Sequence, residues 1–217
     1  MSMGEELDEL RDEIASQVAR ELPRLQGRAS EHDSPALATM ARLRRGVGVP
    51  FGADAEASSE LLRLIRFPAD QSPVNQHGET TPVGQLLEDA YAVVTLVAFT
   101  RVEVRRSDGE SGKEWPSFGR DMRRLRREPG KEAAAERLMR ILLRSRRSEV
   151  DQHLRRAFSL LASEDLGVDA EALVRDLGYW EADAQWVQKR WAFHFWAGQE
   201  ARSEEDSRIE MTEGVQG

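Results

Sequence analysis

Arginines recur along the middle of this 217-residue chain at spacings that suit the surface of a helix. Four of them are separated by three, four and three residues, which predicts that their guanidinium groups share one helix face: Arg137, Arg140, Arg144 and Arg147. The preceding predicted helix repeats the arrangement. There the apolar Phe118, Met122 and Leu125 would face the core, and the outward positions hold Arg120, Arg123, Arg124 and Arg127. Two smaller groups flank these stripes, namely Arg42, Arg44 and Arg45 before them, and Arg155 and Arg156 after them.

Guanidinium groups in this number suit a polyanion. Each is planar and permanently charged, and each matches the oxygens of a phosphate bidentately. Neutralised phosphates release condensed counterions, so such binding is strong at low salt and steeply salt-sensitive. Nothing in the pattern indicates reading of base edges, and we expect recognition of backbone or shape.

The net charge of −8 hides a strong segregation of charge along the chain. Residues 120–147 carry 11 bases against 4 acids, whereas residues 1–35 carry 9 acids against 4 bases and residues 160–217 carry 13 acids against 5 bases. A local excess of positive charge matters more for binding than the total.

The alternative to polyanion binding is that these arginines form only solvated helix surface. Only 3 of the 31 basic residues are lysines, so a bias toward arginine codons would explain the residue type, and charged helix faces are commonly just solvated surface. Acids that would pair with these arginines one turn away are sparse, however. The group as a whole therefore favours polyanion binding.

Helix patterns dominate the chain. Apolar periodicity, capping residues and prolines predict helices near residues 7–22, 34–45, 59–67, 83–104, 117–127, 131–146, 148–162, 169–177 and 181–199. The first is expected to end near Pro23, the expected N-caps include Ser34, Thr81, Ser117 and Asp169, and no convincing strand is visible. We therefore expect an all-α fold, a compact helical bundle of about eight to nine helices or two packed sub-bundles.

The organisation expected from composition has three parts. Residues 1–10 are an acidic N-terminal extension, residues 11–199 are the helical domain with a sub-bundle boundary near 105–116, and residues 200–217 are an acidic disordered tail. No targeting segment is recognisable, and the longest apolar run is too short to span a bilayer. A cytoplasmic location is the default expectation.

Catalytic and metal chemistry find little support. The chain has no cysteine, and its four histidines form no pair at helical spacing, so no metal site and no cofactor are expected. The Gly-Lys within residues 108–114 lacks the other residues of a phosphate-binding loop. The aromatics of residues 179–196 could stack on bases, but an anchoring role in the core or in a subunit interface is favoured.

The order of several motifs resembles one known family, the small subunit (CasB type) of the type I-E CRISPR Cascade complex. The resemblance spans roughly residues 11–198 and rests on five groups of residues: Leu37-Ala38 with Ala41 to Gly46; Thr95 to Phe99; Ser117 to Arg120 with Leu125; Glu136 to Leu143 with Leu154 to Arg156 and Leu160-Leu161; and Leu173, Asp176-Leu177, Trp180, Val187, Trp191-Ala192 and Phe195-Trp196. Each motif is weak alone, but their order and spacing are fairly specific.

The resemblance implies a helical, non-enzymatic protein of antiviral defence. Its partners would be the other Cascade proteins, the crRNA and the target DNA, with copies of the subunit associating in pairs. Basic surfaces would hold the displaced DNA strand and stabilise the R-loop without reading sequence. Matching positions carry this role to Arg44, Arg45, Arg120, Arg137, Arg144, Arg155 and Arg156, whereas Arg123, Arg124, Arg127, Arg140 and Arg147 are added from helical geometry alone.

Two further hypotheses stay open at this point. The chain could be a helical protein-interaction adaptor whose basic helices dock an acidic protein partner. An enzyme whose site assembles only in the folded chain is the third, and no residue pattern points to it.

Overall fold

Helices form nearly all of the regular structure in the computed structural model, which describes residues 2–68, 71–105 and 117–197. These residues form nine helices and two short strands: α1 (Met3–Ser30), α2 (Ser34–Arg45), α3 (Ala55–Leu64), α4 (Pro82–Thr100), β1 (Val104–Arg105), α5 (Phe118–Arg127), α6 (Glu132–Leu142), α7 (Arg147–Ser163), β2 (Val168–Asp169), α8 (Ala170–Gly178) and α9 (Trp186–Trp196). Helices account for 69% of the described residues. The predicted all-α class and helix number are confirmed.

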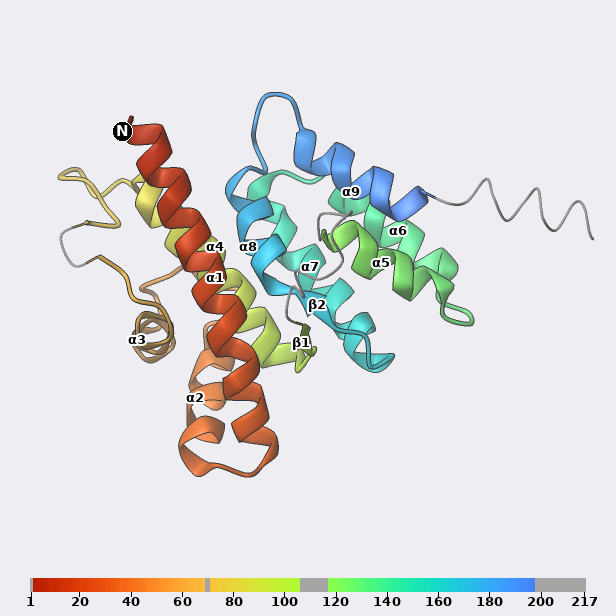
Figure 1. The fold of residues 1–217 in the computed structure, drawn as a ribbon, viewed down its shortest axis with the longest axis horizontal. Coiled ribbons are helices and arrows are strands. Elements are labelled where there is room, and N and C mark those ends of the chain that lie inside the picture. Colours follow the sequence, from red (N-terminus) through yellow and green to blue (C-terminus); the bar gives the residue numbers. More distant parts are fainter. Residues whose placement is uncertain (1, 69–70, 106–116, 198–217) are drawn as a thin grey trace, which may run out of the picture.

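The helices fall into two groups that lie side by side (Figure 1). Helices α1 to α4 pack on one another, and α5 packs on α6, α7 and α9. The groups are joined because α8 packs against α1 and α4, and α7 packs against α4. One continuous apolar core therefore runs through both groups.

Helix α4 is the central core helix. Thr81 caps it by accepting a hydrogen bond from the Gly84 N–H at 3.0 Å, and Pro82 occupies the first turn, where its missing N–H costs nothing. By length and composition alone α4 could cross a membrane, but 67% of its apolar window is buried inside the protein. This burial is what a core helix requires.

Strands β1 and β2 correct the expectation of no strand. The two pair in parallel, with Val104 opposite Val168, and helix α4 ends at Thr100 rather than near 104 because Arg101 has a left-handed backbone with φ 61°. On the other edge of β1, the Gln26 side chain of α1 donates to the Val102 carbonyl at 2.7 Å and accepts from the Val104 N–H at 3.1 Å. Two-residue strands are too short to show a pattern in the sequence.

Several helix ends differ from the prediction. Helix α1 continues through Pro23 to Ser30, because Leu22 and Leu25 are both buried and their packing outweighs a proline cost of about 3 kcal/mol. Helix α3 begins at Ala55, where Asp54 accepts a hydrogen bond from the Ala57 N–H at 2.8 Å. The N-cap of α2 is Asp33 rather than Ser34.

Only a small part of the predicted division into segments falls within the described residues. Residues 3–10 form the first turns of α1, and Leu7 and Leu10 pack against the core. The boundary near 105–116 and the tail at 200–217 lie almost wholly outside the described residues. The division itself stays a prediction.

Candidate nucleic-acid interface

Helix α5 presents arginines on the side opposite its core residues. Phe118, Met122 and Leu125 are buried, as predicted, whereas Arg124 and Arg127 are exposed. Neither of these two arginines forms an ion pair within the described part of the chain. Arg120 and Arg123 are half-buried instead, and Arg123 donates to the Ala197 carbonyl at the end of α9 at 3.2 Å. Two of the four predicted outward arginines are thus exposed to solvent.

The electrostatic environment of Arg124 on α5 is dominated by neighbouring positive charges. Partial burial and the positive charge of Arg105 lower the pKa of Arg124, and Arg120 and Arg123 act in the same direction. The buried carboxylate of Asp121 opposes them, but it is already bound to Arg105. A phosphate placed beside Arg124 would relieve this mutual repulsion.

The predicted stripe on α6 is wrong in one respect, because the four arginines do not share a helix. Helix α6 ends at Leu142, and the hydroxyl of Ser145 donates to the Ile141 carbonyl at 2.8 Å in the turn that follows. Arg137 and Arg140 are exposed on α6 and Arg144 is exposed in the turn, whereas Arg147 is the first residue of α7.

Arg147 is a half-buried structural residue. Its side chain is 14% exposed, and it contacts Asp89 of α4 at 2.6 Å and Asp151 of α7 at 2.8 Å. Burial outweighs the positive charge of Arg147 and raises the pKa of Asp89. A guanidinium held in this way is occupied by two carboxylates, and this disfavours a contact between Arg147 and phosphate.

The most suitable phosphate site lies between α6 and α7. A groove of about 630 Å³ there is lined by nine residues: Ala134, Arg137, Leu138, Ile141, Gln152, Arg155, Arg156, Ser159 and Leu160. Within the described residues, Arg137 and Arg156 form no ion pair, and the Arg155 guanidinium lies 4.1 Å from the centre of the Phe99 ring. Three guanidiniums and the Gln152 amide form a donor set for phosphate oxygens, whereas the Ser159 hydroxyl already donates to the Arg155 carbonyl at 2.9 Å.

A second hollow of about 400 Å³ adjoins the outer face of α6, and Arg137, Arg140 and Arg144 line it. Here Arg140 is paired with Glu136 at 2.9 Å, one turn away on the same helix. The carboxylate reduces the positive charge of this hollow. The α6–α7 groove is therefore the stronger candidate.

The α2 cluster does not join these helices, because α2 and α6 lie on opposite sides of the molecule (Figure 1). Arg42 is paired with Glu60 at 2.5 Å, and Arg45 is paired with Glu56. Arg44 donates to the Ala98 carbonyl at 2.7 Å. Only Arg44 of the three is without a carboxylate partner in the described residues.

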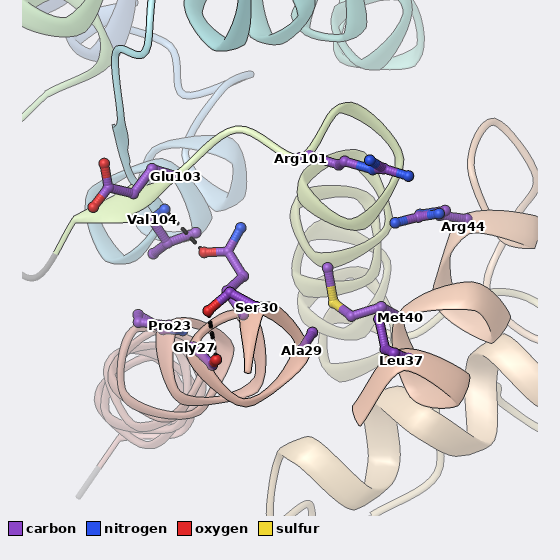
Figure 2. A pocket seen from close by; sticks show the side chains of 11 residues that line it. Pro23, Gly27, Ala29, Ser30, Leu37, Met40, Arg44, Arg101, Glu103 and Val104 are labelled. Carbon is purple, nitrogen blue, oxygen red and sulfur yellow. Dashed lines mark hydrogen bonds between the residues drawn. The ribbon is translucent and has the colours of Figure 1, made fainter. Parts of the chain in front are cut away.

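Arg44 lines a separate groove of about 650 Å³ between α1, α2 and the end of α4. Figure 2 shows Arg44 and Arg101 directed into the same space, above Leu37 and Met40. Burial and the nearby charge of Arg101 lower the pKa of Arg44. Sequence reasoning missed Arg101, and the only signal for it was its position directly after the apolar α4 pattern.

The histidines lie apart from one another in the sequence, at positions 32, 77, 153 and 194. No cluster of three His, Asp or Glu side chains suited to a metal occurs in residues 2–68, 71–105 or 117–197. The Ser117 hydroxyl lies 2.5 Å from His194 Nδ1, and Ser117 is 2% exposed. This buried contact fastens α9 to the start of α5, and it explains why Ser117 is the N-cap of α5 without a side-chain capping bond. The Gly-Lys segment at 108–114 lies outside the described residues.

The C-terminal aromatics divide between the core and the surface. Trp180 and Trp191 are buried with ring centres 4.9 Å apart, and Phe195 is buried as well. Phe193 is 68% exposed and Trp186 is 37% exposed. The predicted anchoring role thus holds for the first three.

These observations define a class, namely a helical protein whose middle helices carry outward arginines without ion-pair partners among the described residues. The sequence matches the family model for CRISPR-associated protein Cse2 over residues 39–196. The chain therefore belongs to the Cse2 family, also named CasB, the small subunit of the type I-E Cascade surveillance complex. A comparison with curated proteins found no match.

Solved structures agree on the fold. A Cse2-family protein from Thermus thermophilus is 22% identical with a TM-score of 0.59, and the match covers 85% of this chain and 98% of that one. CasB from Thermobifida fusca is 22% identical with a TM-score of 0.58 over 85% and 98% of the two chains. A chain of a CRISPR RNA-guided surveillance complex is 21% identical with a TM-score of 0.60 over 89% and 99%.

Proposed function

We propose that this subunit is non-catalytic and binds the phosphate backbone of nucleic acid without reading its sequence. It would stabilise the R-loop between crRNA and target by holding the displaced DNA strand. Its partners would be the other Cascade proteins, the crRNA, the target DNA and a second copy of itself, and its compartment the cytoplasm.

The observation that carries the proposal is a set of outward guanidiniums on α5, α6 and α7 that form no ion pair within the described residues. Arg124 and Arg127 lie on α5, and Arg137, Arg155 and Arg156 surround the α6–α7 groove. A helix face that is only solvated usually carries acids among its cations. On α1, for example, Glu21 pairs with both Arg20 and Arg24.

Backbone contacts suffice for this role because an R-loop is a nearly balanced exchange of one duplex for another. A few arginine–phosphate contacts on the displaced strand can therefore decide how long the loop persists. Since such contacts are to phosphate, they would serve any target sequence equally.

Charge reversal on α5 tests the proposal. We expect R124E/R127E to shorten the R-loop lifetime several-fold in a type I-E complex assembled with this subunit, because reversed charges repel the displaced strand. The matched control is R20E/R24E on the acidic α1, which changes the net charge equally. An unchanged lifetime in the α5 variant would contradict a role in strand holding.

The adaptor hypothesis predicts a different outcome of the same experiment. If the basic helices dock an acidic protein, R124E/R127E should prevent the subunit from joining the complex. Quantifying the subunit in the purified complex, before the lifetime is measured, separates the two outcomes.

A further inference from the structure

The chain leaves the described structure on the arginine-bearing side of the molecule. Helix α9 packs along α5, and the last described residue, Ala197, accepts a hydrogen bond from Arg123 of α5 through its carbonyl at 3.2 Å. Arg127 lies one turn beyond Arg123 on the same side of α5, and Arg124 is its sequence neighbour. Residues 198–217 therefore start beside the exposed cations.

Residues 198–217 are a polyanion by composition. They carry six carboxylates, at Glu200, Glu204, Glu205, Asp206, Glu210 and Glu213, against two arginines, at Arg202 and Arg208. Three of the acids are consecutive. A run of this kind offers closely spaced oxygens to guanidinium groups, and carboxylates accept bidentate bonds from arginine as phosphates do.

The segment is long enough to reach the exposed cations. Twenty residues span at most about 70 Å when extended, whereas the 10 residues of α5 extend only about 15 Å. A tethered segment also faces its target at an effective concentration of about millimolar. Weak individual pairs can thus compete with a nucleic acid that arrives from solution.

We propose that the acidic segment 198–217 docks on Arg124 and Arg127 of α5 and competes there with the phosphate backbone. The inference rests on the proposed function, since it assigns a regulator to the same arginines. Docking would weaken binding to short or isolated strands. A strand presented by the assembled complex displaces the segment, because it offers more phosphates at once.

Binding of a single-stranded oligothymidylate by the full chain tests this idea, with fluorescence anisotropy measured from about 50 to about 300 mM salt. We expect the triple variant E204Q/E205Q/D206N to bind at least about threefold more tightly than the unaltered chain at the lowest salt, with a steeper salt dependence. The matched control is E6Q/E9Q/E31Q, which removes three exposed carboxylates from α1 and the turn that follows it.

The outcomes are distinguishable. If the two triple variants bind equally, net charge and not docking governs affinity, and the inference is overturned while the proposed function stands. If no variant binds the oligonucleotide at any salt, the proposed function fails as well.

A second measurement does not depend on nucleic acid. A labelled peptide of residues 198–217 should bind the chain truncated after Ala197, which retains all nine helices of the described structure, and R124E/R127E should abolish this binding. A peptide that binds neither protein, or both equally, overturns the docking.

Discussion

The arginines of this chain differ in the partners that their guanidinium groups have. Arg147 is enclosed by carboxylates, Arg140 is paired with a neighbour on its own helix, and Arg156 has no ion-pair partner in the described structure. Helical spacing, for Arg140 and Arg147, and the family resemblance, for Arg156, assigned all three to the same role. The distinction matters because a guanidinium already bound to a carboxylate gains less from a phosphate.

Arg156 in the α6–α7 groove and Arg140 in the neighbouring hollow should therefore differ in their effect on DNA binding. We expect Arg156→Ala to lower the salt slope of single-stranded DNA binding by about one, because one phosphate contact is lost. Arg140→Ala should change the slope less, since Glu136 already neutralises that charge. Titrations at several salt concentrations provide the slopes, and equal slopes for wild type and Arg156→Ala would remove Arg156 from the binding surface.

Arg147 should matter for stability instead. Arg147→Ala leaves the buried carboxylate of Asp89 without its cation, and losing one partner of a buried pair costs about 3–5 kcal/mol. The neighbouring Arg146 is exposed, so Arg146→Ala should leave the free energy of unfolding nearly unchanged. Urea denaturation of both variants measures the difference, and similar midpoints would contradict the structural role of Arg147.

At the scale of elements, the contact between α5 and α9 depends on a glycine. A Cβ atom at Gly119 would collide with the Trp191 carbonyl oxygen, so the two helices can approach this closely only without a side chain there. Phe118 meets Trp191 at the same place, with ring centres 5.0 Å apart. This contact holds the arginines of α5 in position relative to the end of α9.

Two alanine substitutions test this contact. Gly119→Ala should destabilise the protein by roughly 1–3 kcal/mol, because α9 must move away from α5. Gly27→Ala, inside α1 with open space around it, should stabilise the protein by about 0.5–1 kcal/mol. Thermal denaturation of the two variants should therefore shift the midpoint in opposite directions, and a harmless Gly119→Ala would show that the helices are not in close contact.

Periodicity and capping residues were enough to predict the helices, but not where several of them end. Thr81 and Asp169 cap α4 and α8 as predicted, because a cap is a local interaction. The end of α6 before Arg144 was missed because residues 143–146 are compatible with a helix, and the break follows from tertiary packing of the Arg147 ion pair and of Trp180, whose Nε1 donates to the Ser145 carbonyl at 3.0 Å.

For the candidate site, the sequence predicted the exposure of single arginines but not the contacts between distant segments. The exposure of Arg124, Arg127 and Arg137 followed from helix geometry. The separation of the α2 cluster, and the approach of Arg101 to Arg44, depend on contacts between distant segments that no local pattern records.

At the scale of the whole molecule, buried carboxylates connect elements that are distant in the chain. Asp121 of α5 accepts from the Asp169 N–H at 3.1 Å and binds Arg105 of β1, and Asp176 of α8 binds Arg190 and Trp191 of α9. Burial raises the pKa of Asp121 to about 6, and burial raises the pKa of Asp176 to about 6 as well.

Stability should consequently increase on mild acidification. These folded-state pKa values exceed the ordinary aspartate value of 3.8, so the folded chain holds more protons than the unfolded chain between about pH 4 and 7. The free energy of unfolding should be larger at about pH 5.5 than at about pH 7.5, by on the order of 1 kcal/mol for each group. Urea titrations at both pH values measure this change, and Asp121→Asn should remove its share; an equal pH dependence in that variant would contradict the assignment.

The side-chain amide of Gln26 covers the outer edge of strand β1. A strand with an open edge is a template on which another chain can add its own backbone. Gln26 occupies the carbonyl of Val102 and the N–H of Val104, the groups on the outer edge of β1. Within the described structure, one side chain thus occupies the outer edge of β1, and another chain cannot add its backbone there without displacing it.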